Sequence, residues 1–397
     1  MKSISSQVFG KRILPVMVSL QILAIACGPQ GKTSELQEAW NSSNNPVRIS
    51  GSDMVESFGD LPLSGGIDVK AWSDTYWPTS QGGISVRWSS TAGADFAYEL
   101  FNKPKASEIE LRTLAPAEKY DLFMNRMDFP TVQDERRRTR VLKTVEGHPE
   151  FQAGYEIPGW EGLCHGWAPA ALNFKEPAHS VTIPSRVGPV RFYPSDIKAL
   201  LIYYQQYSGN RSTRTSMVAD RCNVEFTKLD EKLNSGEITQ EQWQAARDQG
   251  ACGDINAGTF HLILANEIGR KKQGFVVDKT RDFEVWNQPV NSFVSEVTAT
   301  KEGAGPGAAA GTVKEIELVT RMAYTVETQP SRYAIGAAEE EAEYRYILEL
   351  DAKGKIIGGR WLSDDRPDFA WRETTPQFRG YFAGLKHLYE KSIAPNP

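Results

Sequence analysis

The sequence has no excess of basic residues, few cysteines and no apolar run long enough to cross a bilayer. Its 45 lysines and arginines stand against 50 aspartates and glutamates, which gives a net charge of −5 at pH 7. Nucleic-acid-binding proteins usually carry a basic face, so we predict no nucleic-acid partner. The charge runs at 136–140 and 339–343 are interpreted as solvated surface. No motif typical of a metal or cofactor site stands out, and we predict neither.

The four cysteines stand in different chemical settings. Cys27 closes an apolar N-terminal segment, and Cys164 lies in a turn rich in tryptophan and small residues. Cys222 and Cys252 flank a stretch with helical spacing. One lipid-anchor candidate, one nucleophile candidate and one disulfide candidate therefore account for all four.

The N-terminus has the pattern of an export signal. Lys2, Lys11 and Arg12 precede the apolar stretch 13–26, which is too short for a mature membrane-spanning helix but suits a signal peptide. The stretch ends in LAIAC, which resembles a bacterial lipoprotein cleavage box with Cys27 as the acylated residue. We expect a signal peptide over 1–26 and an exported protein, either secreted or held on the cell-envelope membrane by the lipid. The alternative is ordinary cleavage with Cys27 incidental.

The remaining chain alternates segments of helical and strand character, which indicates an α+β protein. Residues 27–70 are rich in Gly, Ser, Asn and Pro and predict a flexible tether. The Gly- and Ala-rich run 301–312 is interpreted as a boundary between a core over 71–300 and a β-rich C-terminal region over 313–397. Periodicity predicts helices over 116–129 and 194–207, a helical pair over 226–249, and strands over 258–264, 273–280, 343–350 and 355–362.

Cys164 is the candidate nucleophile. It lies in GWEGLCHGWAPAAL (159–172), just before a predicted helix that contains Pro169. The amides and macrodipole at a helix N-terminus stabilise a thiolate. A nucleophilic cysteine also needs a base, a group that orients the base, and donors for the oxyanion.

Among the five histidines, His261 is the candidate base. His165 is adjacent to Cys164, and neighbouring side chains diverge; the other three lie in polar surroundings at 148, 179 and 387. His261 falls in the predicted strand GTFHLIL, which would hold the imidazole rigidly. If the strands at 258–264 and 273–280 form a hairpin about 269–270, Asp278 lies opposite His261 and can fix its tautomer. A purely structural histidine is the alternative.

Several blocks resemble the transglutaminase elicitor family, which contains secreted transglutaminases of plant-pathogenic oomycetes. They are the Cys164 block, DIKALL (196–201), FHLILAN (260–266), FVVD (275–278), EVWNQPV (284–290), YWPT (76–79) and PAEKY (116–120). The resemblance implies a papain/transglutaminase-like cysteine acyltransferase core with Cys164, His261 and Asp278 as its triad. It also implies oxyanion donors, for which the Cys164 amide and the indole of Trp160 or Trp167 are the candidates.

The implied reaction is transfer of a protein glutamine acyl group, through a Cys164 thioester, to an amine such as lysine or to water. The partners would then be protein or peptide substrates that carry glutamine and lysine. A papain-like peptidase or amidase with the same triad is one alternative. A surface-binding lipoprotein without catalysis is another.

Cys222 and Cys252 remain, and we predict that they pair. Exported proteins fold in an oxidising compartment, and a helical hairpin over 223–251 would bring its two ends together. Two separate thiols are the alternative.

Overall fold

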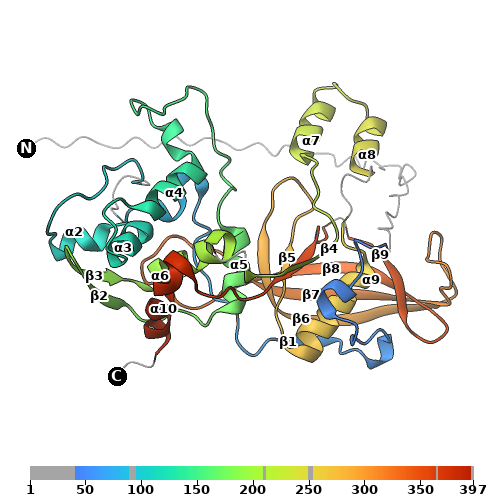
Figure 1. The fold of residues 1–397 in the computed structure, drawn as a ribbon. Coiled ribbons are helices and arrows are strands. Elements are labelled where there is room, and N and C mark those ends of the chain that lie inside the picture. The colour runs from blue at the N-terminus through green and yellow to red at the C-terminus, as the bar shows by residue number, and fades with distance from the viewer. Residues whose placement is uncertain (1–40, 89–94, 209–211, 249–253, 364, 395–397) are drawn as a thin grey trace, which may run out of the picture. The chain divides into compact units, whose positions relative to one another are not determined.

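The computed structural model describes residues 41–88, 95–208, 212–248, 254–363 and 365–394 (Figure 1). The predicted signal peptide and Cys27 lie outside the described residues. The described residues all belong to one compact unit. None of the helices in the described ranges is both long enough and apolar enough to cross a membrane.

One antiparallel sheet organises this unit. Its strand order is β4-β10-β5-β6-β7-β8-β9, and the short β1 pairs with β6. A smaller hairpin joins β2 to β3. The bounds are β1 Ser64–Gly66, β2 Val181–Ser185, β3 Gly188–Phe192, β4 Thr215–Val218, β5 Val276–Asp278, β6 Asn287–Glu302, β7 Lys314–Val326, β8 Ala338–Leu350, β9 Ile356–Trp361 and β10 Ala370–Glu373.

The long strands follow the alternation of their sequences. In β8, Tyr344, Tyr346 and Leu348 are buried, whereas Arg345 between the two tyrosines is exposed. Because successive side chains of a strand point to opposite faces, this pattern buries one face of the sheet. The predicted hairpin of 343–350 with 355–362 is confirmed by the pairing of β8 with β9.

The helices fall into four groups, one of which is the short α1 beside β4. α2, α3, α4, α6 and α10 lie together away from the sheet, and α5 lies between them and the sheet, since it packs on both α6 and β6 (Figure 1). α9 packs on β8 and β9, and α7 packs on α8. The bounds are α1 Val47–Ser50, α2 Glu108–Thr113, α3 Pro116–Phe123, α4 Pro130–Thr139, α5 Cys164–Asn173, α6 Pro194–Tyr203, α7 Phe226–Asn234, α8 Gln240–Asp248, α9 Ala257–Ile263 and α10 Leu385–Ile393.

The mixed α+β class is confirmed, and so is the helical pair over 226–249. Gly236 in the turn between the two helices has a φ of 75°. The predicted boundary at 301–312 is wrong, because this run connects β6 to β7 within one continuous sheet. The predicted tether is wrong for its described part, because α1 and β1 fold within 41–70 and β1 joins the sheet. The helix predicted over 116–129 ends at Phe123.

The strand predicted over 258–264 is a helix, α9. Asn256 caps it, since its side chain accepts hydrogen bonds from the amides of Gly258 and Thr259. Every residue of α9 is buried, including the polar Thr259 and His261, so no exposed face marks a helical period. A short run of this kind has no periodicity that distinguishes a helix from a strand.

Candidate active site

Cys164 is the first residue of α5, at the end of a tightly held turn. The Leu163 amide donates to the Tyr76 carbonyl at 2.6 Å, and the Thr79 amide donates to the Glu161 carbonyl at 2.8 Å. Gly162 lies so close to the Tyr76 ring and backbone that a β-carbon would collide with both. The turn therefore needs glycine at 162, and it delivers a buried free thiol to the N-terminus of α5.

Close helix packing fixes the position of α5. A β-carbon on Gly166 would meet the Ile202 carbonyl of α6, so the glycine lets the two helices approach. Pro169 lies inside α5, beyond its first turn. The backbone N–H of Cys164 is one of the first four of the helix, which have no partner within it.

Asn287, the first residue of β6, reaches the thiol. Its Nδ2 lies 3.8 Å from the Cys164 Sγ, and Sγ lies 3.6 Å from the Val285 carbonyl oxygen. The Trp371 indole N–H donates to Asn287 Oδ1 at 2.7 Å. This bond requires the oxygen of the amide to face Trp371, so the NH₂ group faces the sulfur.

Sequence reasoning missed both Asn287 and Trp371. Asn287 belongs to the EVWNQPV block, but we gave it no role. A hairpin folded about residues 282 and 283, in place of the one predicted about 269–270, would have placed Asn287 opposite Asp278. Trp371 lies in β10, far along the chain, and its only local signal is an aromatic residue in a short strand.

Asp278 ends β5 directly opposite Asn287. Its Oδ1 accepts hydrogen bonds from the Trp286 amide at 3.0 Å and from the Thr280 amide and hydroxyl, both at 3.3 Å. Its Oδ2 is buried and has no hydrogen-bond partner. Burial raises the pKa of this carboxyl group to about 7, partly offset by the bonds from Trp286 and Thr280.

The thiol is protonated at rest. Burial raises the pKa of Cys164 to about 11, and the negative charge of Glu327 adds to the rise, whereas hydrogen bonds from Asn287 partly offset it. The position at the helix N-terminus does not by itself produce a thiolate, because desolvation of the charged form outweighs it.

His261 lies elsewhere in the core. Its Nδ1 forms a 2.8 Å hydrogen bond with the Tyr346 hydroxyl, which in turn bonds the Thr320 hydroxyl at 2.6 Å. Its ring lies 5.9 Å from that of Phe58, and burial lowers its pKa to about 4. The predicted hairpin between His261 and Asp278 is wrong, since His261 is in α9 and β5 pairs with β6 and β10. The described contacts do not bring His261 to Cys164 or Asp278.

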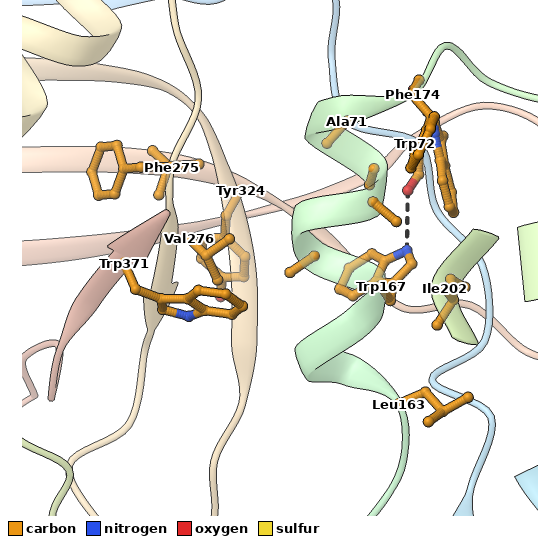
Figure 2. Packing of buried hydrophobic residues seen from close by; sticks show 14 of the residues in the cluster. Ala71, Trp72, Leu163, Trp167, Phe174, Ile202, Phe275, Val276, Tyr324 and Trp371 are labelled. Carbon is orange, nitrogen blue, oxygen red and sulfur yellow. Dashed lines mark hydrogen bonds between the residues drawn. The ribbon is translucent and has the colours of Figure 1, made fainter. Parts of the chain in front are cut away.

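The two tryptophans proposed as oxyanion donors have different positions. Trp167 is fully buried, and its indole N–H donates to the Trp72 carbonyl at 3.2 Å (Figure 2). That N–H is engaged in the core, so the expectation for Trp167 is wrong. Trp160 packs edge-on against Phe283, with ring centroids 5.8 Å apart, and its oxyanion role stays a prediction.

The remaining cysteine prediction is not decided. Cys222 is buried, and its amide donates to Asp368 Oδ2 at 2.6 Å. Cys252 lies outside the described residues, so the Cys222–Cys252 pairing stays a prediction. In the described ranges no cluster of His, Cys, Asp or Glu side chains is arranged to hold a metal ion.

Comparisons with known proteins find similarity over most of the chain. A model of the family described as transglutaminase elicitor matches residues 48–380. Among solved structures, the crystal structure of the GP42 transglutaminase from Phytophthora sojae matches with a TM-score of 0.62 and 23% sequence identity, covering 90% of this chain and 99% of that chain. At this identity the likeness shows a shared fold. No curated protein matches.

Proposed function

The chain belongs to the transglutaminase elicitor family, and we propose that it is a transglutaminase-type acyltransferase with Cys164 as its nucleophile. Family membership confirms the resemblance noted from the motifs. One observation carries the proposal beyond the family: the Cys164 thiol lies at the N-terminus of α5 with the Asn287 amide group directed at it.

The proposed reaction has two halves. Sγ of Cys164 attacks the γ-carboxamide carbon of a protein glutamine, ammonia leaves, and a thioester remains. A primary amine, such as the side chain of a lysine, then attacks the thioester carbonyl, which forms an isopeptide bond and releases the thiol. Water in place of the amine gives deamidation.

Asn287 is the proposed side-chain donor to the oxyanion. The carbonyl carbon must come within bonding distance of Sγ, so its oxygen lies within reach of groups around the sulfur. Asn287 Nδ2 and the free N–H of Cys164 are both suited to receive the negative charge. The bond from Trp371 holds the Asn287 amide in its donating orientation.

The triad implied by the family resemblance is revised in this proposal. Cys164 and Asp278 are retained, since Asp278 lies opposite Asn287 in the sheet. His261 is not used as the base, because its ring bonds Tyr346 within the buried interface of α9 and β8.

Acceptor choice separates this proposal from a papain-like peptidase or amidase. The test incubates the protein with a glutamine-donor peptide, with and without a fluorescent primary amine, and follows ammonia release and the peptide mass. We expect a mass gain equal to the amine minus ammonia. Cys164→Ala should lower incorporation to background without changing the thermal midpoint. Release of ammonia with water as the only acceptor would favour the amidase.

A non-catalytic binding lipoprotein is the second alternative. Alkylation of the Cys164 thiol distinguishes it, because a binding function should survive alkylation and acyl transfer should not. Persistence of the full biological effect after complete alkylation would contradict the enzyme proposal.

We further propose that the protein is exported and that Cys27 carries a lipid anchor. The support is the basic start, the apolar stretch 13–26 and the small residues before Cys27. Cys27→Ser should block processing or move the protein to the soluble fraction. Recovery of the wild-type protein in the soluble fraction with an unmodified Cys27 would rule out lipidation.

A further inference from the structure

Acyl transfer by Cys164 needs a group that removes the thiol proton. With the pKa of the thiol at about 11, only a trace of thiolate is present at neutral pH, so the rate depends on a nearby base. His261 bonds Tyr346 through Nδ1 between α9 and β8, and its Nε2 is buried there without a partner. The His165 ring stacks on Trp371 with centroids 4.2 Å apart, but His165 directly follows Cys164, and neighbouring side chains diverge.

The register of the sheet places a carboxylate on the face of the thiol. Directly opposite residues of an antiparallel pair project from the same face, with β-carbons about 4.5–5.5 Å apart. Asp278 is opposite Asn287, and Asn287 contacts Sγ. The pairing of β10 with β5 supports the same face for Asp278. Trp371 lies opposite Val276, which projects from the same face of β5 as Asp278, and Trp371 also bonds Asn287. In Figure 2, Val276 and Trp371 extend toward α5, whereas Phe275 points away from it.

The two oxygens of Asp278 are in different situations. Oδ1 is held by three hydrogen bonds from Trp286 and Thr280, which fix the carboxyl group. Oδ2 is buried without a partner. A buried oxygen with no donor is costly to stability, and a catalytic role is one of the explanations for such a group in a native structure.

We propose that Asp278 is a catalytic residue, the general base that takes the Cys164 proton on Oδ2 while Oδ1 stays bonded to the backbone. This inference rests on the proposed acyltransferase function. As Sγ bonds to the γ-carbonyl carbon, the proton passes to Oδ2 and the carbonyl electron pair moves onto oxygen. Asp278 then protonates the departing nitrogen, and the C–N bond breaks to release ammonia. In the second half, the attacking amine gives a proton to Oδ2, the C–S bond breaks, and Sγ takes the proton.

Glu327 is the competing carboxylate, because its charge also acts on the thiol. Its Oε2 accepts a hydrogen bond from Gln288 Nε2 at 2.9 Å. Gln288 follows Asn287 in β6, and successive side chains of a strand point to opposite faces. Gln288 therefore projects from the face of β6 opposite to Asn287. The charge of Glu327 nevertheless acts on the thiol more strongly than that of Asp278, and Glu327 Oε1 is also buried without a partner. Glu327→Gln is therefore the essential control. The other titratable groups that interact electrostatically with Cys164 or Asp278 are Tyr76, Tyr207, Asp282, Glu327, Tyr344 and Asp368.

The test uses Asp278→Asn, which keeps an Oδ1 acceptor for Trp286 and Thr280 but removes the base. Wild-type acylation, followed as ammonia release from a glutamine peptide, should fall on the acid side with a midpoint near pH 7, the pKa to which burial raises Asp278. Asp278→Asn should lower the acylation rate by about 10²- to 10⁴-fold and abolish this acid limb. Glu327→Gln and His261→Gln should retain the limb.

A second measurement distinguishes a base from a structural residue. Iodoacetamide alkylates the Cys164 thiolate and needs no base. The negative charge of Asp278 raises the pKa of Cys164, so Asp278→Asn should alkylate faster than wild type at pH 8–9 while its acylation is slower. A damaged site would slow both reactions.

Three results would overturn the assignment: an acid limb retained in Asp278→Asn, an acid limb lost instead in Glu327→Gln or His261→Gln, or alkylation by Asp278→Asn no faster than by wild type. Failure of the proposed function looks different, since a wild-type protein with an alkylatable Cys164 would then release no ammonia from any glutamine peptide.

Discussion

Replacing Asn287 with alanine removes the side-chain donor that faces the Cys164 sulfur at 3.8 Å. Loss of one oxyanion donor in enzymes of this kind lowers kcat by about 10²- to 10³-fold, or about 3–4 kcal/mol of transition-state stabilisation. The donor acts on charge that develops only during the reaction. The loss should therefore appear in kcat, with KM for the glutamine peptide little changed.

The same variant carries a stability cost that can be worked out separately. The Trp371 indole N–H loses its acceptor at 2.7 Å in a buried site, and a buried donor without a partner costs about 1–3 kcal/mol. Urea unfolding measures this cost, and the kinetic assays are made well below the unfolding transition of the variant.

A double-mutant cycle with Trp371→Phe tests the link between the two residues. Trp371→Phe alone should lower kcat, because the Asn287 amide is then free to turn its oxygen toward the sulfur. Added to Asn287→Ala, it should have little further effect on kcat. A fall of less than about fivefold in kcat for Asn287→Ala, or fully additive losses in the double variant, would refute the reasoning.

Three other predictions concern stability. Burial lowers the pKa of His261 to about 4, from about 6.5 in the unfolded chain. The free energy of unfolding should therefore fall by up to about 3 kcal/mol as the pH drops from 6.5 toward 4 and below, because the buried ring must then be protonated. Urea unfolding of His261→Gln should show a smaller decrease at acid pH than wild type, and equal decreases would contradict this. Gly162→Ala should lower the free energy of unfolding by about 1–3 kcal/mol, because the added β-carbon overpacks the site. Gly159→Ala is the control and should leave it unchanged, since a β-carbon there meets nothing within 4 Å. Equal thermal midpoints for the two variants would contradict the close approach at Gly162. Cys222→Ser should lower the free energy of unfolding by about 3–4 kcal/mol if a disulfide joins Cys222 to Cys252. Free thiols at both positions in non-reducing peptide mapping would exclude the bond.

The sequence was sufficient for the elements whose pattern is local. The helical pair over 226–249 and the hairpin of β8 with β9 follow from periodicity and turn residues, and both are present. Cys164 was correctly placed at the junction of a tight turn and a helix, although it is the first residue of α5 and does not precede it.

The base assignment failed where the local pattern was ambiguous. GTFHLIL is short and mostly apolar, and its alternation about His261 fits a strand as well as a buried helix. Asn256, a preferred N-cap residue just before the run, was the available signal for a helix. Once the segment is a helix, the argument that paired His261 with Asp278 no longer applies. The pairing of β5 with β6 instead places Asp278 opposite Asn287, which contacts the thiol.

The site depends on a register that no single segment encodes. Asp278 and Asn287 share a face only because β5 and β6 pair with 278 opposite 287, and the intervening residues 279–286 also supply the Val285 carbonyl near Sγ and the Trp286 amide on Asp278. Side chains of a strand alternate with a period of two, so a slip of one residue in β6 would turn Asn287 to the opposite face. The hydrogen bond from Trp371 to Asn287 stabilises this register, because Trp371 of β10 can reach Asn287 only when the Asn287 side chain is on the face toward α5. The chemistry of Cys164 is in this sense fixed by the pairing of three strands that are distant from it in sequence.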